Sequence, residues 1–258
     1  MTLLAVDVGN TQTHLGVFDG DVLKREWRAS TDPARTGDEL ALLFQQFLQL
    51  YNLEFSTFDG VSICSVVPRL TQELRDMVSR YFGFQALVVG PGIKTGIAVR
   101  MDNPREVGAD RIANAVAAHA MFEKEPVVVV DFGTAITVDA VSAAGEYLGG
   151  AIAPGIDTAA AGLYSATAQL RRVELIAPPE VIGKSTVQAV QSGLVYGFAG
   201  MVDGLVEGVT KELGGDARVV ATGGLAPTVI EHCHRVERFE PMLTLVGLKL
   251  IYERNSTS

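Results

Sequence analysis

Two short runs in the sequence contain residue types that can bind phosphate. Val6–Thr11 reads VDVGNT and Val130–Ala135 reads VDFGTA. Glycine lets a turn bring backbone N–H groups close to a phosphate, threonine adds a hydroxyl donor, and aspartate can hold a hydrated cation that bridges phosphate oxygens. One such run is equally typical of an ordinary hairpin turn. The two aspartates, Asp7 and Asp131, lie 131 − 7 = 124 residues apart, close to half of the 258-residue chain, which favours a repeated phosphate-binding element.

Two further segments could contribute chemistry. The run Val220–Leu225, VATGGL, contains paired glycines that would let the backbone lie close to a purine and ribose. Asp110 and Arg111 place a carboxylate next to a guanidinium, which suits a substrate with a hydroxyl to deprotonate and an anionic end to clamp. The alternative is structural: Asp110 caps a helix that begins near Arg111, and Arg111 makes a surface ion pair.

The first half of the chain predicts the elements that would position these residues. Apolar strands over 3–8, 13–18 and 22–29 form a meander, with the hairpin turn Asp19-Gly20 between the second and third. The spacing of Thr36–Glu39 is that of a capping box, followed by apolar residues at helical spacing. A strand, a second helix and another strand complete the order β-β-β-α-β-α-β.

The second half repeats this order. The pattern predicts a helix over 107–122, strands over 127–131, 135–141, 147–153 and 218–221, helices over about 155–170 and 185–212, a short helix after Gly224 and a last helix over about 242–252. We therefore expect an α/β protein with two like lobes that face a cleft. The expected domains are residues 1–118 and 119–258.

Composition limits the classes of function. There are 21 Lys and Arg against 30 Asp and Glu, a net charge of −9, without a basic cluster, which argues against nucleic acid as a partner. Cys64 and Cys233 cannot form a disulfide framework or a four-thiolate zinc site, and His232-Cys233-His234 lacks a further cysteine partner. The chain starts without a basic leader, and the apolar stretch 185–202 contains Gln, Ser and Gly. We expect a cytoplasmic protein that does not bind membranes.

The paired Asp-Gly-Thr runs and the later paired glycines resemble the phosphate 1, phosphate 2 and adenosine elements of the acetate and sugar kinase, Hsp70 and actin superfamily. This resemblance implies two actin-like (RNase H-like) lobes, each a mixed β-sheet with flanking helices. Within the superfamily, the whole chain is most similar to type III pantothenate kinases. The matching segments are Asp7–Thr11, Ser65–Pro68, Asn103–Arg111, Asp131–Ala135, Gly149–Gly155 and Gly223–Gly224.

The resemblance implies an enzyme that uses ATP to phosphorylate pantothenate to 4'-phosphopantothenate, the first step of coenzyme A biosynthesis. It implies that Asp110 accepts the proton of the pantothenate hydroxyl. The implied pantothenate-binding residues are Gly108, Ala109, Asp110, Arg111 and Thr186. The implied ATP-binding residues are Asp7, Val8, Gly9, Asn10, Thr11, Gln12, Thr13, His14, Gly133, Thr134, Gly223 and Gly224.

The resemblance also implies cations and a partner subunit. Asp131 would hold a monovalent cation, K⁺ or NH₄⁺, and Asp7 would be the partner of Mg²⁺ that enters with ATP. In the family the residue that matches Thr186 reaches pantothenate across a homodimer interface, whereas by sequence logic Ser185 or Thr186 is a helix N-cap. Met101 stands where some relatives carry an aromatic residue against the substrate.

Two other functions stay open at this stage. The paired runs by themselves permit another small-molecule kinase or phosphatase of the superfamily. A non-enzymatic transcription accessory factor of the same fold is the second alternative, because fold does not fix function.

Overall fold

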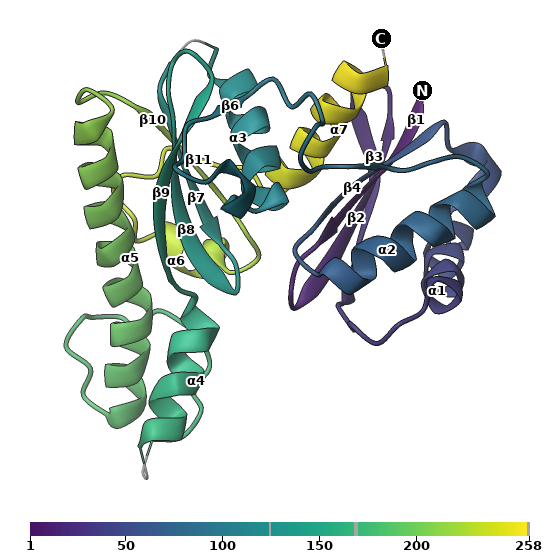
Figure 1. Cartoon of the computed structure of the whole chain (residues 1–258). Helices are drawn as coiled ribbons and strands as arrows, with labels where there is room; N and C mark the ends of the chain where they lie inside the picture. Colours follow the sequence, from purple (N-terminus) through teal and green to yellow (C-terminus); the bar gives the residue numbers. More distant parts are fainter. Residues whose placement is uncertain (124, 168–169, 257–258) are drawn as a thin grey trace. The chain divides into compact units, whose positions relative to one another are not determined.

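The computed structural model describes residues 1–123, 125–167 and 170–256, which form two compact units (Figure 1). Unit 1 contains Met1–Ala98 and Asp102–Ala117 together with the C-terminal helix α7 (Leu243–Ser256). Unit 2 contains Val99–Met101 and Ala118–Met242. The sequence-based division at residue 118 differs from these units chiefly in α7, which packs with the N-terminal sheet.

A five-stranded sheet forms the centre of unit 1, in the order β3-β2-β1-β4-β5. Its strands are β1 (Thr2–Val8), β2 (Gln12–Asp19), β3 (Val22–Ser30), β4 (Gly60–Ser65) and β5 (Leu87–Val88). The helical elements are α1 (Gly37–Gln49), α2 (Pro68–Met77), α3 (Ala109–Met121), which begins in this unit, α7, and the short turns η1 (Phe55–Thr57), η2 (Val78–Phe82) and η3 (Pro104–Glu106). β1 is antiparallel to β2 and parallel to β4. The order β-β-β-α-β-α-β is therefore confirmed for the first half. The two residues of the turn between β2 and β3 are Gly20 and Asp21, one position later than expected.

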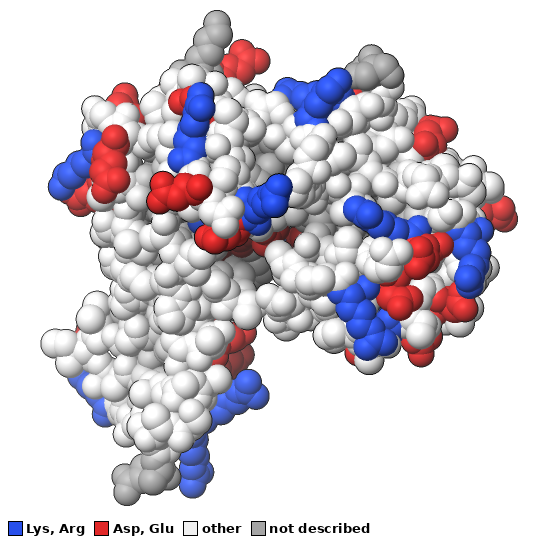
Figure 2. Space-filling view, in the orientation of Figure 1, with Lys and Arg blue, Asp and Glu red and all other residues white. Residues whose placement is uncertain are grey.

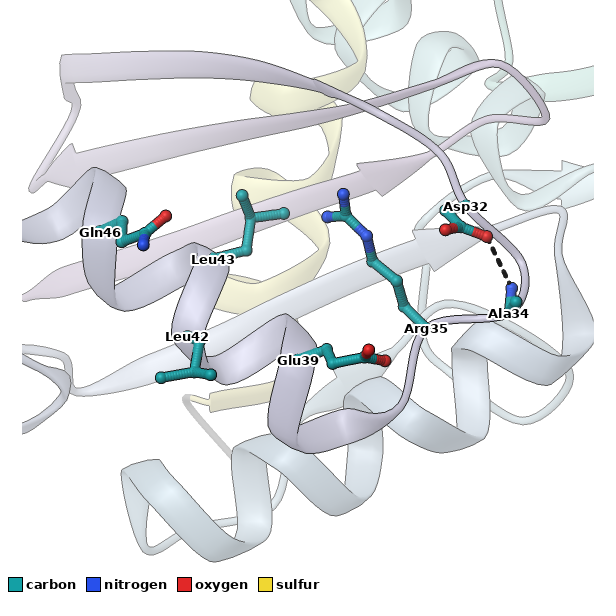
Figure 3. Close-up of a pocket in the computed structure, with 7 residues that line it drawn as sticks. All are labelled: Asp32, Ala34, Arg35, Glu39, Leu42, Leu43 and Gln46. Carbon is teal, nitrogen blue, oxygen red and sulfur yellow. Dashed lines mark hydrogen bonds between the residues drawn. The ribbon is translucent and has the colours of Figure 1, made fainter.

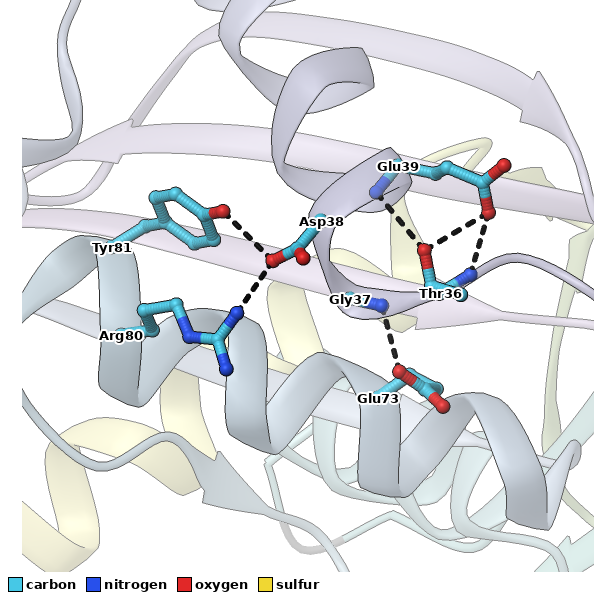
Figure 4. Close-up of polar contacts among 7 residues, drawn as sticks. All are labelled: Thr36, Gly37, Asp38, Glu39, Glu73, Arg80 and Tyr81. Carbon is cyan, nitrogen blue, oxygen red and sulfur yellow. Dashed lines mark hydrogen bonds and ion pairs between the residues drawn. The ribbon is translucent and has the colours of Figure 1, made fainter.

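The start of α1 is fixed by a capping box and by contacts to α2 (Figure 4). The Thr36 hydroxyl accepts a hydrogen bond from the Glu39 backbone N–H, and the Glu39 carboxylate accepts from the Thr36 N–H at 2.8 Å. The Glu73 carboxylate of α2 accepts from the Gly37 N–H at 2.7 Å. Arg80 and Tyr81 both donate to Asp38. These contacts hold α1 and α2 side by side on one face of the sheet.

The two faces of this sheet are covered by different helices. The apolar core between the sheet and the helices α1 and α2 includes Phe44, Leu74 and Ile63, all almost completely buried. On the other face, the Ser62 hydroxyl of β4 donates to the Leu248 carbonyl of α7 at 3.0 Å. A Cβ at Gly247 would lie 1.9 Å from the Ala113 carbonyl oxygen. Glycine at this position therefore allows α7 to pack directly against α3.

Unit 2 repeats the topology with a six-stranded sheet in the order β11-β10-β7-β8-β9-β6. Its strands are β7 (Val127–Phe132), β8 (Ala135–Val141), β9 (Glu146–Pro154), β10 (Arg218–Thr222), β11 (Arg238–Phe239) and the short edge strand β6 (Ala98–Val99), and its helices are α4 (Ile156–Ala166), α5 (Thr186–Glu212) and α6 (Ala226–Ile230). β7 is antiparallel to β8 and parallel to β10. The expected α/β class with two similar mixed sheets is confirmed.

Helix α5 is long and apolar enough, by length and composition, to cross a membrane. One of its faces is nevertheless part of the core of unit 2, where Leu194, Val202 and Val206 pack with the residues of the sheet. Its opposite face carries the exposed glycines Gly193, Gly197, Gly200, Gly204 and Gly208. A Cβ at any of these glycines would meet open space among the described residues. The helix thus has one packed face and one smooth, uncovered face.

The surface charges are mixed. On the face drawn in Figure 2, Lys and Arg side chains lie among Asp and Glu side chains over both units. Several of them form exposed ion pairs, such as Arg80 with Asp38 at 2.7 Å. Exposed pairs of this kind contribute about 0 to 1 kcal/mol each to stability. These ion pairs therefore contribute little to the stability of the fold.

Candidate active site

The first of the two similar runs, Val6–Thr11, leads into the tight turn between β1 and β2. The Gly9 N–H donates to the Gln12 carbonyl oxygen at 3.0 Å, and a Cβ at Gly9 would lie 3.1 Å from the same oxygen. Glycine therefore permits the close approach that the turn needs. Asn10, Thr11 and Gln12 are exposed at its tip.

Thr31, the residue that follows β3, supports this turn from the side. The Thr31 N–H donates to the Thr11 carbonyl oxygen at 2.9 Å. The hydroxyls of Thr13 and Thr31 lie 2.9 Å apart. Because Thr13 is 8 % exposed, this hydrogen bond is partly shielded from water. Both contacts tie the turn to the residue that follows β3.

The side chains of Val8 and His14, two of the expected ATP-binding residues, contact parts of unit 1 other than the turn. The Val8 side chain is buried in the core of unit 1, so that only its backbone can approach a ligand. The His14 imidazole Nε2 lies 2.9 Å from the Glu26 carboxylate of β3. Burial lowers the pKa of His14, although the Glu26 hydrogen bond acts in the opposite direction. His14 is therefore engaged by the sheet rather than by the turn.

Asp7 is an unusual carboxylate because of its surroundings. It lies near the end of β1, directly beside Cys64 of the parallel strand β4. The Cys64 thiol donates a hydrogen bond to Asp7 Oδ1 at 3.1 Å. Burial raises the pKa of Asp7 from 3.8 to about 7, the thiol lowers it, and the nearby charge of Asp110 raises it. Burial is the largest of these causes, and the charge of Asp110 adds a smaller repulsion.

Asp110 reaches this place from the first turn of α3. The Ile112 N–H donates to the Gly108 carbonyl oxygen, so that Gly108 immediately precedes the helix. Asp110 Oδ1 accepts from the Arg111 N–H at 2.8 Å. A Cβ at Gly108 would lie 2.3 Å from Asp110 Oδ1, hence a larger residue there would displace the carboxylate. The helix begins at Ala109, two residues after the start of the predicted range 107–122. Asp110 stands inside its first turn and is not the residue that precedes a helix starting at Arg111.

The second of the two similar runs, Val130–Ala135, forms the equivalent turn in unit 2. Asp131 lies near the end of β7, and the Gly133 N–H donates to the Ala135 carbonyl oxygen at 3.1 Å. The Thr134 carbonyl oxygen accepts from the Gly155 N–H at 3.1 Å and from the Thr158 hydroxyl at 2.9 Å. The start of α4 thus holds this turn in place.

The paired glycines lie against the same turn. Gly223 follows β10 with φ +100°, a conformation that favours glycine, and a Cβ there would lie about 2.5 Å from the Phe132 carbonyl oxygen. The Leu225 N–H donates to the same oxygen at 3.3 Å. Thr222, just before Gly223, lies directly beside Asp131 in the parallel pairing of β10 and β7. Unit 2 therefore brings together Asp131, the Gly133 turn and the Gly223 turn.

Thr186 belongs to α5, outside the segments that form these turns. It is exposed in the first turn of α5, where the Ser185 hydroxyl accepts from the Gln188 N–H at 3.2 Å. Ser185 is therefore the N-cap, which leaves the Thr186 side chain free of a capping role.

Sequence reasoning missed Cys64 and Thr222 as neighbours of the two aspartates. The signal that could have found both is the pairing of parallel strands, because their carboxyl ends meet at one edge of a sheet. β4 ends in Ser65 and β10 in Thr222, and each aspartate lies one residue before the end of its own strand.

A pocket of about 370 Å³ lies elsewhere in unit 1, between the β3–α1 connection and α1 (Figure 3). Its lining includes Asp32, Arg35 and Leu43, and the Arg35 side chain extends between the other two. The lining contains none of the predicted site residues. The β3–α1 connection that borders this pocket also contains Thr31, which supports the turn between β1 and β2.

Among residues 1–123, 125–167 and 170–256, no group of three or more His, Cys, Asp and Glu side chains could hold a metal ion. Single carboxylates at Asp7 and Asp131 suit a cation that keeps most of its water or phosphate ligands. Mg²⁺ in kinases is bound in this way, through one or two carboxylates and the phosphates of the substrate.

Comparisons with known proteins match the chain to one enzyme family. A family model described as Type III pantothenate kinase matches residues 3–208. The chain is 51 % identical over 254 residues to a type III pantothenate kinase of Moorella thermoacetica, which covers 98 % of this chain and all of that protein. It is 51 % identical to the enzyme of the same description from Thermobifida fusca, again over 98 % of this chain and all of the relative.

Solved structures share the fold at low identity. A Campylobacter jejuni protein assigned to the Baf family of transcriptional activators has a TM-score of 0.62 at 21 % identity, covering 99 % of this chain and all of that one. The ROK hexokinase of Thermus thermophilus has a TM-score of 0.55 at 14 % identity, with 99 % and 100 % coverage. At such identities the likeness shows the fold alone.

Proposed function

Because the chain belongs to the type III pantothenate kinase family, we propose that it transfers the γ-phosphoryl group of ATP to the primary hydroxyl of pantothenate, with Asp110 as the proton acceptor. The product is 4'-phosphopantothenate, and the reaction is the first step of coenzyme A biosynthesis. The role of Asp110 is supported by one observation within unit 1. The charge of Asp110, at the start of α3, acts on Asp7 at the first phosphate turn.

Asp110 acts by orienting and deprotonating the attacking hydroxyl. Phosphoryl transfer passes through a loose transition state whose charge is spread over the phosphoryl oxygens, so that positioning and charge compensation supply most of the rate. A carboxylate fixed by the Arg111 N–H in the first turn of a helix is well positioned for this role. Gly108 leaves the space that its oxygen occupies.

The other pantothenate contacts follow from the same segment. The guanidinium of Arg111 clamps the pantothenate carboxylate, since a guanidinium can form two parallel hydrogen bonds with a carboxylate. The backbone of Gly108 and Ala109 lines the substrate. Thr186 contributes from a second copy of the chain.

ATP is bound by the turns of both sheets. The first turn, from Asp7 to His14, contacts the phosphates through backbone N–H groups and the exposed side chains at its tip. Gly133 and Thr134 form the second phosphate turn, and Gly223 and Gly224 lie against the nucleoside. The support for these roles is the tight, glycine-dependent geometry of each turn.

Two cations complete the charge balance. Mg²⁺ enters with ATP and is held by Asp7, directly or through water. Asp131, beside the Thr222 position, holds a monovalent cation, K⁺ or NH₄⁺, that compensates phosphate charge during transfer. Oxygen donors of this kind fit both ions, and an acidic chain of net charge −9 has no P-loop lysine motif that could take over their role.

We further propose that the enzyme is a cytoplasmic homodimer. The uncovered glycine face of α5 would let a helix of a second copy approach closely, because small residues form a shallow groove. Exposed apolar side chains near the same helix support this, among them Val181, Ile182 and Val187, which are 66, 79 and 51 % exposed.

A coupled assay of ATP consumption with and without pantothenate tests the function. We expect ADP to form only when pantothenate, Mg²⁺ and K⁺ are all present, and a mass shift of pantothenate by one phosphoryl group. Consumption of ATP with other small alcohols but not with pantothenate would contradict the substrate.

A further inference from the structure

The hydrogen bond between Cys64 and Asp7 has no role in the function described so far. Cys64 is 0 % exposed, and its thiol donates to Asp7 Oδ1 at 3.1 Å. Among the described residues, no other group donates a hydrogen bond to the Asp7 carboxylate. We propose that Cys64 is a positioning residue for phosphoryl transfer, which holds one oxygen of Asp7 so that the other serves the magnesium-bound phosphates. This inference rests on the proposed role of Asp7.

The strand register explains why this pair forms. β1 and β4 are parallel, and Asp7 and Cys64 are directly paired. Their side chains therefore leave the sheet on the same face, next to the turn that begins at Gly9. The neighbouring Ile63 points to the opposite face, into the core beneath α1 and α2.

Unit 2 contains the same strand pairing at the equivalent aspartate. Asp131 of β7 is directly paired with Thr222 of the parallel strand β10, as Asp7 is with Cys64. Thr222 is 2 % exposed. In both halves of the repeat, a short buried side chain with a hydrogen on sulfur or oxygen therefore lies beside the phosphate-site aspartate.

A fixed carboxylate matters because a free one can rotate. Asp7 can present either oxygen, or both, to a cation. A donor on Oδ1 selects one orientation and removes the freedom that ligand binding would otherwise have to restrict. A thiol is a weak donor, so the effect of losing it is moderate. At about 1 kcal/mol for a hydrogen bond, we expect about a fivefold change in binding.

Three substitutions separate donation from packing. Cys64→Ser keeps a hydroxyl donor, Cys64→Ala removes the donor and leaves a small space, and Cys64→Val removes the donor while adding one heavy atom to a buried position. Ile63→Val is the matched control, because it removes one buried methylene from the opposite face of the same strand. Thermal unfolding of all four variants measures the structural cost.

The first measurement is calorimetric binding of Mg·ADP, which does not depend on turnover. We expect Cys64→Ala and Cys64→Val to bind about fivefold more weakly than the wild type. Cys64→Ser and Ile63→Val should stay within twofold. The second measurement is the Mg²⁺ concentration for half-maximal turnover, which should rise by the same factor while the KM for pantothenate stays unchanged.

The outcomes are distinct. Binding within twofold of the wild type for both Cys64→Ala and Cys64→Val overturns the proposal. Equal weakening in all four variants, in proportion to lost thermal stability, also overturns it, because packing then explains the effect. If the wild type binds Mg·ADP but does not consume ATP with pantothenate, the proposed function fails while the binding series still decides the role of Cys64.

Discussion

The raised pKa of Asp7 makes a quantitative prediction about stability. In the folded chain this carboxyl titrates at about 7, because burial disfavours its charge, instead of near 3.8. The native state therefore holds the proton more tightly than the unfolded state. The contribution of Asp7 to stability is fully present below pH 3.8 and is lost as pH rises through 7. Asp7→Asn, which cannot ionise, removes this dependence.

The magnitude follows from the interval between pH 5 and pH 8. Over this interval the unfolded carboxyl is already ionised, whereas the native one keeps its proton up to about pH 7. Two pH units at about 1.36 kcal/mol each give a loss of about 2 to 3 kcal/mol for the wild type. This is an upper bound, since Asp7 keeps some contact with water.

Urea unfolding at pH 5 and pH 8, in EDTA and without nucleotide, measures this difference. We expect the stability advantage of Asp7→Asn over the wild type to be larger at pH 8 than at pH 5 by about 2 to 3 kcal/mol. Asp76→Asn is the control, because Asp76 is exposed on α2. If the difference between Asp7→Asn and the wild type is the same at both pH values, the reasoning about burial and repulsion at this site is wrong.

Four further predictions concern the proposed roles. Asp110→Asn should fold and bind ATP but turn over pantothenate at least about a hundredfold more slowly; unchanged steady-state turnover would exclude Asp110 as the base. Activity should be low in a sodium-only buffer and recover with K⁺ or NH₄⁺; rates that do not depend on the cation would contradict the role of Asp131. Gly223→Ala should destabilise unit 2 by about 1 to 3 kcal/mol, from its positive φ and its contact with the Phe132 backbone, and should weaken ATP binding; a wild-type melting temperature would refute this. Gly200→Leu should convert a dimer into monomers in sedimentation with little loss of monomer stability, because a side chain there meets open space; an unchanged sedimentation coefficient would remove α5 from the interface.

Much of the fold was predictable because its signals are local. Alternating and continuous apolar runs indicated the long strands, and the Thr36–Glu39 spacing located the start of α1. The 124-residue offset between Asp7 and Asp131 indicated the repeat, which the two sheets confirm. The position of α7 was not predictable in this way. Its packing on the first sheet depends on contacts across almost the whole chain, such as that between Ser62 and Leu248.

The sequence by itself determined the glycine turns, the strand that carries each aspartate and the family. These depend on residue types at fixed short spacing, which act through backbone conformation and through the alternation of side chains along a strand. Tertiary structure alone decided which groups surround Asp7. Cys64 and Asp110 come from positions 57 and 103 residues further along the chain, and only the parallel pairing of β1 with β4 and the start of α3 bring them close. Burial and repulsion act over distance in space, so the altered pKa of Asp7 could not be inferred from spacing along the chain.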